Sequence, residues 1–180
     1  MNTLVVYESM WGNTKAVAEA VARGVGEGVT LVGVAEAPTP VPEGIDLLVV
    51  GGPTHAFSLT RASTRRDAIA KGAAANPAAP GIREWLEQLP TSSHLNIATF
   101  DTRVGSVRHL PGSAAKAAGK EVRHHHLGRL VETMSFYVND MSGPLLDGEA
   151  ERAHAWGQSL AGMRAAHGQG PTQLGGSDQR

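Results

Sequence analysis

The sequence contains no cysteine. This absence excludes disulfide bonds, thiolate metal sites, iron–sulfur clusters and cysteine nucleophiles. An excess of charge of either sign is also missing, since the formal net charge of the 180 residues is -1. A protein that binds nucleic acid usually carries a basic surface, and this overall balance gives no support for one.

Long apolar runs are absent as well. No stretch approaches the roughly 20 apolar residues of a membrane span. The N-terminal "MNTLVV" has no charged region and too short an apolar run for a signal peptide. We therefore expect a cytoplasmic protein with neither a membrane nor a nucleic acid as partner. With 180 residues, of which 41% are hydrophobic, the chain is large enough for one domain with a real core.

Segments typical of buried strands alternate with segments typical of helices. Strands are predicted at 3–7, 29–35, 45–52, 95–100 and 127–139, the last one interrupted near 132–133. Helices are predicted at 14–25, in two pieces within 61–89, at 111–122 and at 147–166. This alternation indicates an α/β domain at 1–166 with a five-stranded parallel sheet of order 2-1-3-4-5. Residues 167–180 are predicted to be a disordered tail, because they contain almost no apolar side chains.

In an open sheet of this kind, ligands bind beyond the carboxyl ends of the strands, beside the first strand. The loops after the first, third and fourth predicted strands therefore become the candidate site. Their sequences are "ESMWGNT", "GGPTHAFS" and "TFDTRVGS".

The first of these loops leads straight into a predicted helix and has the composition of a phosphate site. A helix N-terminus offers free N–H groups and a positive dipole end. Ser9 and Thr14 add hydroxyl groups, while Gly12 and Asn13 tolerate unusual backbone angles. The alternative is an ordinary capped helix, with Ser9 or Asn13 as the cap and no ligand.

Three segments resemble the flavodoxin family. "SMWGNT" resembles its phosphate loop, usually Ser/Thr-x-Thr-Gly-x-Thr, and "VVGGPTHAF" resembles its second flavin loop. "DMSGPLLDGEAERAHAWGQSLA" resembles the C-terminal end of actinobacterial flavodoxin-like proteins. The resemblance implies a flavodoxin-like three-layer sandwich that transfers electrons through non-covalently bound FMN. It implies no catalytic side chain and no metal.

The resemblance places FMN contacts in all three loops. Trp11 stands where the family usually has a Thr, but its indole N–H can still donate one hydrogen bond. The implied cofactor-binding residues are Ser9, Met10, Trp11, Gly12, Asn13, Thr14, Pro53, Thr54, His55, Ala56, Phe57, Asp101, Thr102 and Arg103.

The second loop departs from the family pattern. Matching it residue by residue puts His55 at the position of an aromatic ring and Ala56 at a glycine whose peptide flips on reduction. The flipped turn requires a positive φ, which costs alanine about 1 kcal/mol or more. One-electron reduction should therefore be less favoured than in flavodoxins. Alternatively, His55 is a loop histidine without a ligand.

The third loop also departs from the family pattern of acidic residues and a Tyr, because it has no Tyr and carries Arg103 beside Asp101 and Thr102. A cation beside the ring would stabilise reduced flavin, which is anionic at N1. Both departures favour two-electron chemistry. Alternatively, Arg103 forms a weak surface pair with Asp101.

Basic residues gather directly after the second loop, at Arg61, Arg65, Arg66 and Lys71. Such a patch fits an acidic redox protein or a nicotinamide nucleotide, or it is simply a solvated helix face. Three histidines in a row, His124–His126, do not share a face of a helix or strand, so no metal site is predicted there.

Three functions remain open at this point. The first is an electron carrier of the flavodoxin family. The second is an FMN-dependent NAD(P)H or quinone reductase. The third is a binding or regulatory module that kept the fold and lost the flavin, which Trp11 and the missing Tyr would explain. A monomer and a homodimer are equally compatible with the sequence.

Overall fold

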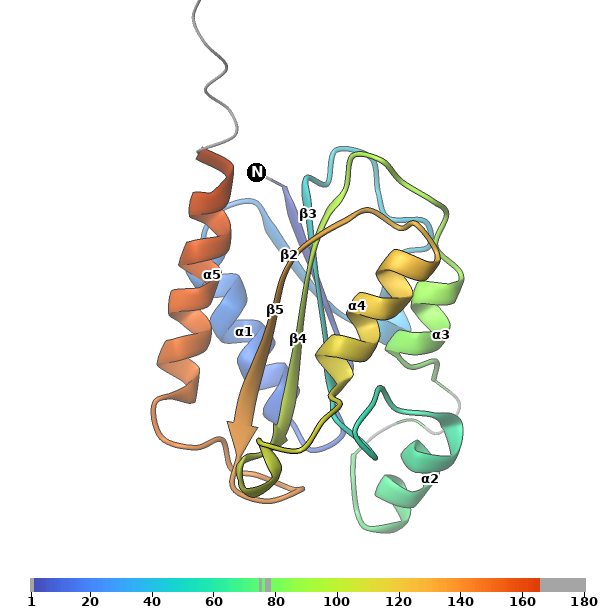
Figure 1. Ribbon diagram of the computed structural model, residues 1–180, viewed down its shortest axis with the longest axis vertical. Helices are drawn as coiled ribbons and strands as arrows, with labels where there is room; N and C mark the ends of the chain where they lie inside the picture. Colours follow the sequence, from blue (N-terminus) through green and yellow to red (C-terminus); the bar gives the residue numbers. More distant parts are fainter. Residues whose placement is uncertain (1, 75, 77–78, 166–180) are drawn as a thin grey trace, which may run out of the picture.

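The computed structural model describes residues 2–74, 76 and 79–165. Its centre is one parallel sheet with the strand order β2-β1-β3-β4-β5 (Figure 1). The strands are β1 (Thr3–Tyr7), β2 (Val29–Gly33), β3 (Leu47–Pro53), β4 (Asn96–Val104) and β5 (Arg129–Val138). All neighbouring strands pair in parallel. The predicted α/β class and strand order are confirmed.

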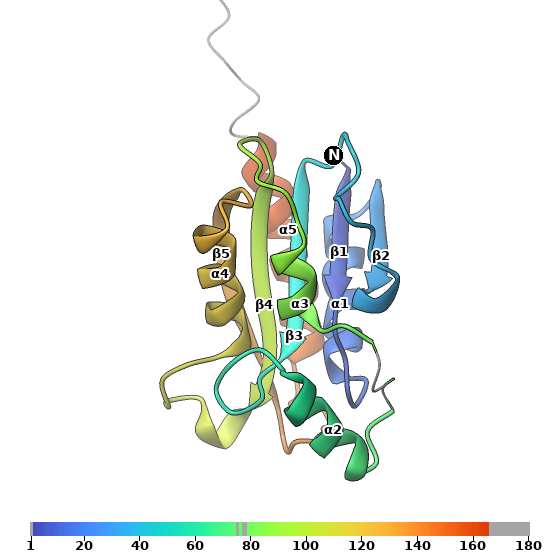
Figure 2. The same ribbon diagram turned by 90° about the vertical axis from the view of Figure 1, so that its right-hand side faces the viewer.

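Helices cover both faces of this sheet. On one face lie α1 (Asn13–Val25) and α5 (Glu149–Ala165), and on the other lie α3 (Ile82–Glu87) and α4 (Ala114–His124) (Figures 1 and 2). The remaining helix, α2 (Ala62–Ala70), lies beyond the carboxyl edge of the sheet instead of on a face (Figure 1). The result is a three-layer sandwich whose carboxyl edge is flanked by an extra helix.

Because the sheet is covered on both sides, the middle of its central strands β1 and β3 is uniformly apolar, at residues 4–6 and 47–50. Along β1, Leu4 and Val6 join the core under α3 and α4, while Val5 joins the core under α1 and α5. Trp85 belongs to the first core and Trp156 to the second, and both are almost fully buried. Both tryptophans are therefore core residues.

Two strands, β2 and β4, end two or more residues away from their predicted carboxyl ends, and the pairing between strands explains both differences. Strand β2 stops at Gly33 because its only neighbour, β1, ends opposite it at Tyr7. A short 3-10 turn, η1 (Val34–Glu36), follows. Strand β4 instead runs four residues beyond its predicted end, because β3 and β5 accompany it. Residues 101–103 therefore belong to a strand and not to a loop.

The predicted interruption of the fifth strand near 132–133 is a bulge. Leu130 lies opposite Ile97 and Glu132 lies opposite Ala98, so Val131 is the extra residue. The strand otherwise continues without a break from Arg129 to Val138. A bulge of this kind increases the local twist without ending the pairing.

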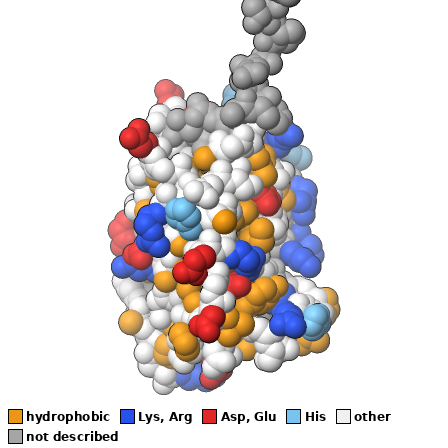
Figure 3. Space-filling view, turned by 90° about the vertical axis from the view of Figure 1, so that its left-hand side faces the viewer, with side chains coloured by type: hydrophobic (Ala, Val, Ile, Leu, Met, Phe, Trp, Pro, Cys, Tyr) orange, Lys and Arg blue, Asp and Glu red, His pale blue; other side chains and the backbone are white. Residues whose placement is uncertain are grey.

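Among the helices within the described ranges, none is long and apolar enough to cross a membrane. The predicted tail at 167–180 lies outside the described residues. On the face that carries α1 and α5, acidic and basic side chains are interspersed without a large patch of either sign (Figure 3).

The contact between β3 and β4 predicts a sharp difference between two adjacent glycines. A Cβ atom at Gly51 would lie 2.0 Å from Cζ of the buried Phe100, whereas at Gly52 its nearest neighbour would be Ile82 Cγ1 at 3.6 Å. Phe100 has little room to move, since its ring packs edge-on against Phe136 and Trp156. We expect Gly51→Ala to lower the free energy of unfolding by about 1–3 kcal/mol through overpacking.

The matched control is Gly52→Ala, which should leave the free energy of unfolding within about 0.5 kcal/mol of the wild type. Urea denaturation of the three proteins measures both effects. Equal destabilisation by the two substitutions would contradict the packing argument.

Candidate functional site

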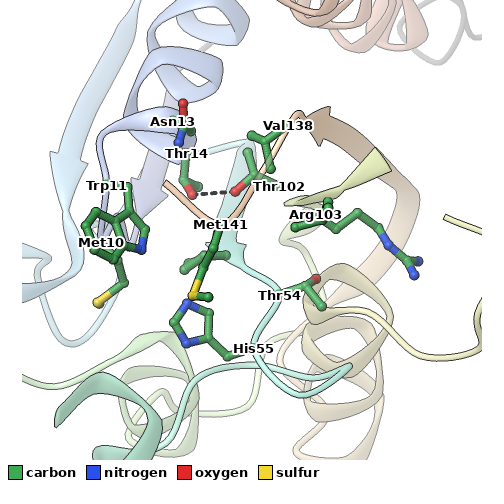
Figure 4. A pocket seen from close by; sticks show the side chains of 12 residues that line it. Met10, Trp11, Asn13, Thr14, Thr54, His55, Thr102, Arg103, Val138 and Met141 are labelled. Carbon is green, nitrogen blue, oxygen red and sulfur yellow. Dashed lines mark hydrogen bonds between the residues drawn. The ribbon is translucent and has the colours of Figure 1, made fainter. Parts of the chain in front are cut away.

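A pocket opens at the carboxyl edge of the sheet. Its volume is about 360 Å³, including the part open to solvent. The walls come from the loop between β1 and α1, the end of β3 with the turn after it, the end of β4, and the end of β5 with its following loop. The lining residues are Met10, Trp11, Asn13, Thr14, Pro53, Thr54, His55, Thr102, Arg103, Val104, Val138 and Met141 (Figure 4).

Most of the residues expected at the site contribute to this lining. The expected residues that do not are Ser9, Gly12, Ala56, Phe57 and Asp101. Sequence reasoning left out Val104, although the third candidate loop contains it. It missed Val138 and Met141, because it considered the loops after only three strands. The available signal was the carboxyl end of the fifth strand, which lies at the same edge of a parallel sheet.

The N-terminus of α1 leaves two backbone donors free beside this pocket. Gly12, at the N-cap, has φ 87, and the helix has no side-chain cap. The Ser9 hydroxyl accepts hydrogen bonds from the N–H groups of Gly12 (3.1 Å) and Lys15 (3.3 Å). Within the described part of the chain, the N–H groups of Asn13 and Thr14 have no hydrogen-bond partner. Ser9 therefore shapes the loop, and the two free N–H groups remain at the positive end of the helix dipole.

A third free donor is the indole of Trp11. Its Nε1 atom is buried and has no hydrogen-bond partner among the described residues. Figure 4 shows this nitrogen on the side of the ring that faces the pocket. A buried N–H without a partner is unfavourable, so a ligand that accepts from it is favoured there. Together with the two backbone N–H groups, this donor set fits a phosphate.

The hydroxyl of Thr14 has a partner within the protein. It forms a 2.8 Å hydrogen bond with the hydroxyl of Thr102, and both side chains are buried (Figure 4). The carbonyl of Thr102 in turn accepts from the N–H of Thr54 at 2.8 Å. These bonds join α1, β4 and the turn after β3, so the two threonines hold the walls of the pocket together.

Two other expected site residues cap α4. The Thr54 hydroxyl accepts from the N–H of Ala114, and Asp101 Oδ2 accepts from the N–H of Ala115, both at 2.8 Å. The Ser113 hydroxyl accepts from the N–H of Lys116 at 3.3 Å. Asp101 is completely buried at the start of this helix, where a carboxylate is stabilised by the dipole. Its role in the structure is to begin α4.

Arg103 holds the loop that follows β4. Its Nη2 atom donates to the carbonyls of Val107 (2.8 Å) and Leu110 (3.2 Å), and the residue is 5% exposed. The stem of the side chain lines the pocket, but the guanidinium points away from it (Figure 4). Arg103 and Asp101 form no ion pair in the described structure, so the alternative of a surface pair is wrong.

The turn after β3 is a tight hairpin with an unusual backbone. His55 and Ser58 exchange two backbone hydrogen bonds of 3.0 Å, and the two residues between them have positive φ angles, 48 at Ala56 and 62 at Phe57. Ala56 thus already has the positive φ that the flipped turn would require of it, and Phe57 adds a second one. Each costs a non-glycine residue about 1 kcal/mol or more. Strain of this kind is typical of functional sites, and Phe57 at its tip is half exposed.

His55 presents a neutral ring to the pocket. Burial lowers the pKa of its imidazole below the ordinary value of 6.5, the positive charge of Lys71 lowers it further, and a hydrogen bond with the backbone of Thr64 partly opposes both effects. At neutral pH the ring is therefore uncharged. It can contact an aromatic ligand without adding a cation.

A buried polar network lies directly behind the first loop. Glu8, 4% exposed, accepts hydrogen bonds from the Thr60 hydroxyl and from the N–H of Ile82. Arg65 donates to Thr60 Oγ1 (3.1 Å) and forms an ion pair with Glu84 (3.0 Å). Because Arg65 is only 5% exposed, it does not belong to the basic surface patch that the sequence suggested.

The pKa values of the two acids in this network, Glu8 and Glu84, are shifted in opposite directions. Burial raises the pKa of Glu8, against the hydrogen bonds from Thr60 and Ile82 and the charge of Arg65. For Glu84, burial would also raise the pKa, but the hydrogen bonds and charge of Arg65 prevail and lower it. Glu8 and Glu84 should therefore have opposite effects on how the free energy of unfolding depends on pH.

We expect Glu8→Gln to gain stability relative to the wild type as the pH rises. A carboxyl whose pKa is raised by folding contributes stability that is present below the unfolded pKa and lost as the pH rises through the folded pKa. Glutamine does not ionise, so the variant lacks this loss. Urea unfolding of both proteins between about pH 4 and pH 8 measures the difference. Parallel stability curves would show that the carboxyl has no raised pKa.

Comparisons with known proteins find relatives in structure but not in sequence. A scan against protein-family models found no match, and a search of curated proteins found none either. A flavodoxin from the domain Archaea superposes with a TM-score of 0.60 at 16% identity, over 91% of this chain and 98% of its own. Flavodoxin 2 from Bacillus cereus superposes with a TM-score of 0.60 at 14% identity, over 91% of this chain and 99% of its own.

A flavodoxin, WrbA-like protein from Agrobacterium tumefaciens gives a TM-score of 0.52 at 20% identity, over 92% of this chain and 98% of its own. Identities this low establish the architecture and leave the ligand open. Together with the strand order and the flanking helices, they show that the chain has the flavodoxin-like fold.

Proposed function

We propose that this protein binds FMN non-covalently at the carboxyl-edge pocket and transfers electrons through it. The observation that carries the proposal is the set of three unpartnered N–H donors at the start of α1: the backbone N–H groups of Asn13 and Thr14 and the indole of Trp11. The flavodoxin-like fold and the sequence resemblance of the first two loops support the same ligand.

In this proposal the N–H groups hold the phosphate. Two of them lie at the positive end of a 13-residue helix, where an anion is stabilised without any basic side chain. The indole N–H supplies the hydrogen bond that a threonine hydroxyl gives in flavodoxins. Residues of the remaining walls, Pro53, Val104, Val138 and Met141, offer apolar surface to a flat ring. Bound FMN would supply the electron-transfer chemistry, which the side chains alone lack.

The reductase alternative loses part of its support. It relied on Arg103, on the basic patch and on Ala56. The guanidinium of Arg103 is engaged by two carbonyls, and Arg65 is buried in an ion pair. The strained backbone at Ala56 remains, and so do the exposed Arg61, Arg66 and Lys71. Anaerobic titration discriminates, because a carrier is reduced in two separate one-electron steps and a reductase in a single two-electron step.

The flavin-free alternative is favoured by the hydrogen bond between Thr14 and Thr102, in which one of the two hydroxyls gives its O–H to the other instead of to a phosphate. Within the described part of the chain the Ser9 hydroxyl only accepts hydrogen bonds, so its own O–H can still donate to a phosphate. An absorption spectrum of the purified protein tests it directly. A flavin band that persists through gel filtration excludes this alternative. The likeness of the C-terminal segment to actinobacterial proteins stays a prediction.

Removing the indole donor should weaken the binding of FMN but not that of riboflavin. We expect Trp11→Phe to lower the affinity for FMN about ten- to hundred-fold, because a hydrogen bond to a charged group contributes about 1.5–3 kcal/mol. The affinity for riboflavin, which has no phosphate, should stay the same. Quenching of flavin fluorescence during titration of the apoprotein measures both constants.

The matched control is Trp156→Phe. Its Nε1 atom is also buried without a partner among the described residues, but it lies in the core and not in the pocket. This variant should bind FMN as the wild type does. If wild-type protein binds FMN and riboflavin equally well, the phosphate site is wrong.

A further inference from the structure

Glu8 occupies a special place in the chain, between the last residue of β1 and the loop that we propose holds phosphate. Its backbone N–H donates to the carbonyl of Gly51 at 2.9 Å, which continues the pairing of β1 with β3 by one residue. Its side chain then turns under the loop and is nearly completely buried. Backbone and side chain are thus both anchored immediately before the loop begins.

The carboxylate links the segments that form two walls of the pocket. One oxygen accepts from the hydroxyl of Thr60, where the segment after β3 leads into α2. The other accepts from the N–H of Ile82, the first residue of α3, at 3.0 Å. The first wall begins directly after Glu8, and the second precedes Thr60. The length of the Glu8 side chain therefore sets the separation of these walls.

The surroundings leave this link little freedom. Arg65 donates to the same Thr60 hydroxyl oxygen and is held by Glu84, which also accepts from the N–H of Gly81 at 2.9 Å. A Cβ atom at Gly81 would lie 2.4 Å from Arg65 Nη1 and 2.8 Å from Glu8 Oε2. The network is packed against the backbone of Gly81 without a gap, so a displacement of Glu8 displaces its neighbours.

We propose that Glu8 is a positioning residue for anion binding: its carboxylate holds the loop at 9–14 and the segment after β3 at the separation that lets the free N–H groups of α1 converge on a phosphate. This inference rests on the proposed function. An apolar side chain would fill the same space at lower desolvation cost, but it would leave the Ile82 N–H and the Thr60 hydroxyl without their acceptor.

The test compares FMN and riboflavin binding in three variants. We expect Glu8→Ala to lower the ratio of FMN to riboflavin affinity about ten-fold or more, because only FMN uses the positioned N–H groups. Glu8→Gln keeps one acceptor oxygen and should recover part of the ratio. The control is Glu149→Gln, another nearly buried carboxylate that accepts from a backbone N–H, that of Tyr137. It should lower stability without changing the ratio.

A second measurement separates this inference from the proposed function. Amide NMR spectra of the apoproteins report the loop directly, and inorganic phosphate serves as the probe. In the wild type, phosphate should shift the amide signals of Asn13 and Thr14, and Glu8→Ala should abolish that response while circular dichroism confirms folding.

If the wild type binds no flavin, the proposed function fails, and the loop amides alone decide the inference. They support it when Glu8→Ala shifts the signals of residues 9–14 and Glu149→Gln does not. The inference is overturned if Glu8→Ala keeps the wild-type affinity ratio, or, without flavin, leaves those signals in place.

Discussion

The need to satisfy buried N–H groups governs the carboxyl edge of this protein. The helices α1 and α4 both begin there, and each begins with N–H groups that have no partner inside the helix. At α4 the protein supplies all the acceptors, from Thr54, Asp101 and Ser113. At α1 it supplies only the hydroxyl of Ser9, which reaches Gly12 and Lys15 and leaves the next donors open. The contrast shows that the open end of α1 is specific to that helix and is not a general property of the edge.

The sheet explains why this edge could be anticipated from sequence. Uniformly apolar segments such as residues 47–50 are typical of strands that are covered on both faces, and parallel strands bring their carboxyl ends together. The loop after β1 and the turn after β3 then had to meet. These features depend on local sequence and on the direction of the strands.

The features that sequence reasoning missed depend on contacts between distant residues. Asp101 and Thr54 were expected to bind a ligand because the resemblance to flavodoxins places FMN contacts in their loops. Their hydroxyl and carboxylate oxygens instead face the first residues of α4, which start more than ten positions later in the chain than Asp101. Strand β4 also continues further than its apolar run, because β3 and β5 pair with it. No pattern in one segment records where its neighbours end.

The charge around the pocket also could not be predicted from the sequence, because it depends on which charged side chains are paired within the fold. Counted along the chain, Arg65 looked like part of a basic surface patch and Arg103 looked like a free cation beside a flavin. Each is 5% exposed and is committed to acceptors of the protein, Glu84 for Arg65 and two backbone carbonyls for Arg103. His55, which lines the pocket, has a lowered pKa and is neutral.

The side chains around the pocket thus offer hydrogen-bond dipoles and apolar surface in place of free positive charge. A flavin bound there would have its reduction potential set mainly by burial and by oriented N–H groups, which stabilise an anion less than a full cation does at the same distance. This environment favours the electron-carrier form of the proposal over the reductase form.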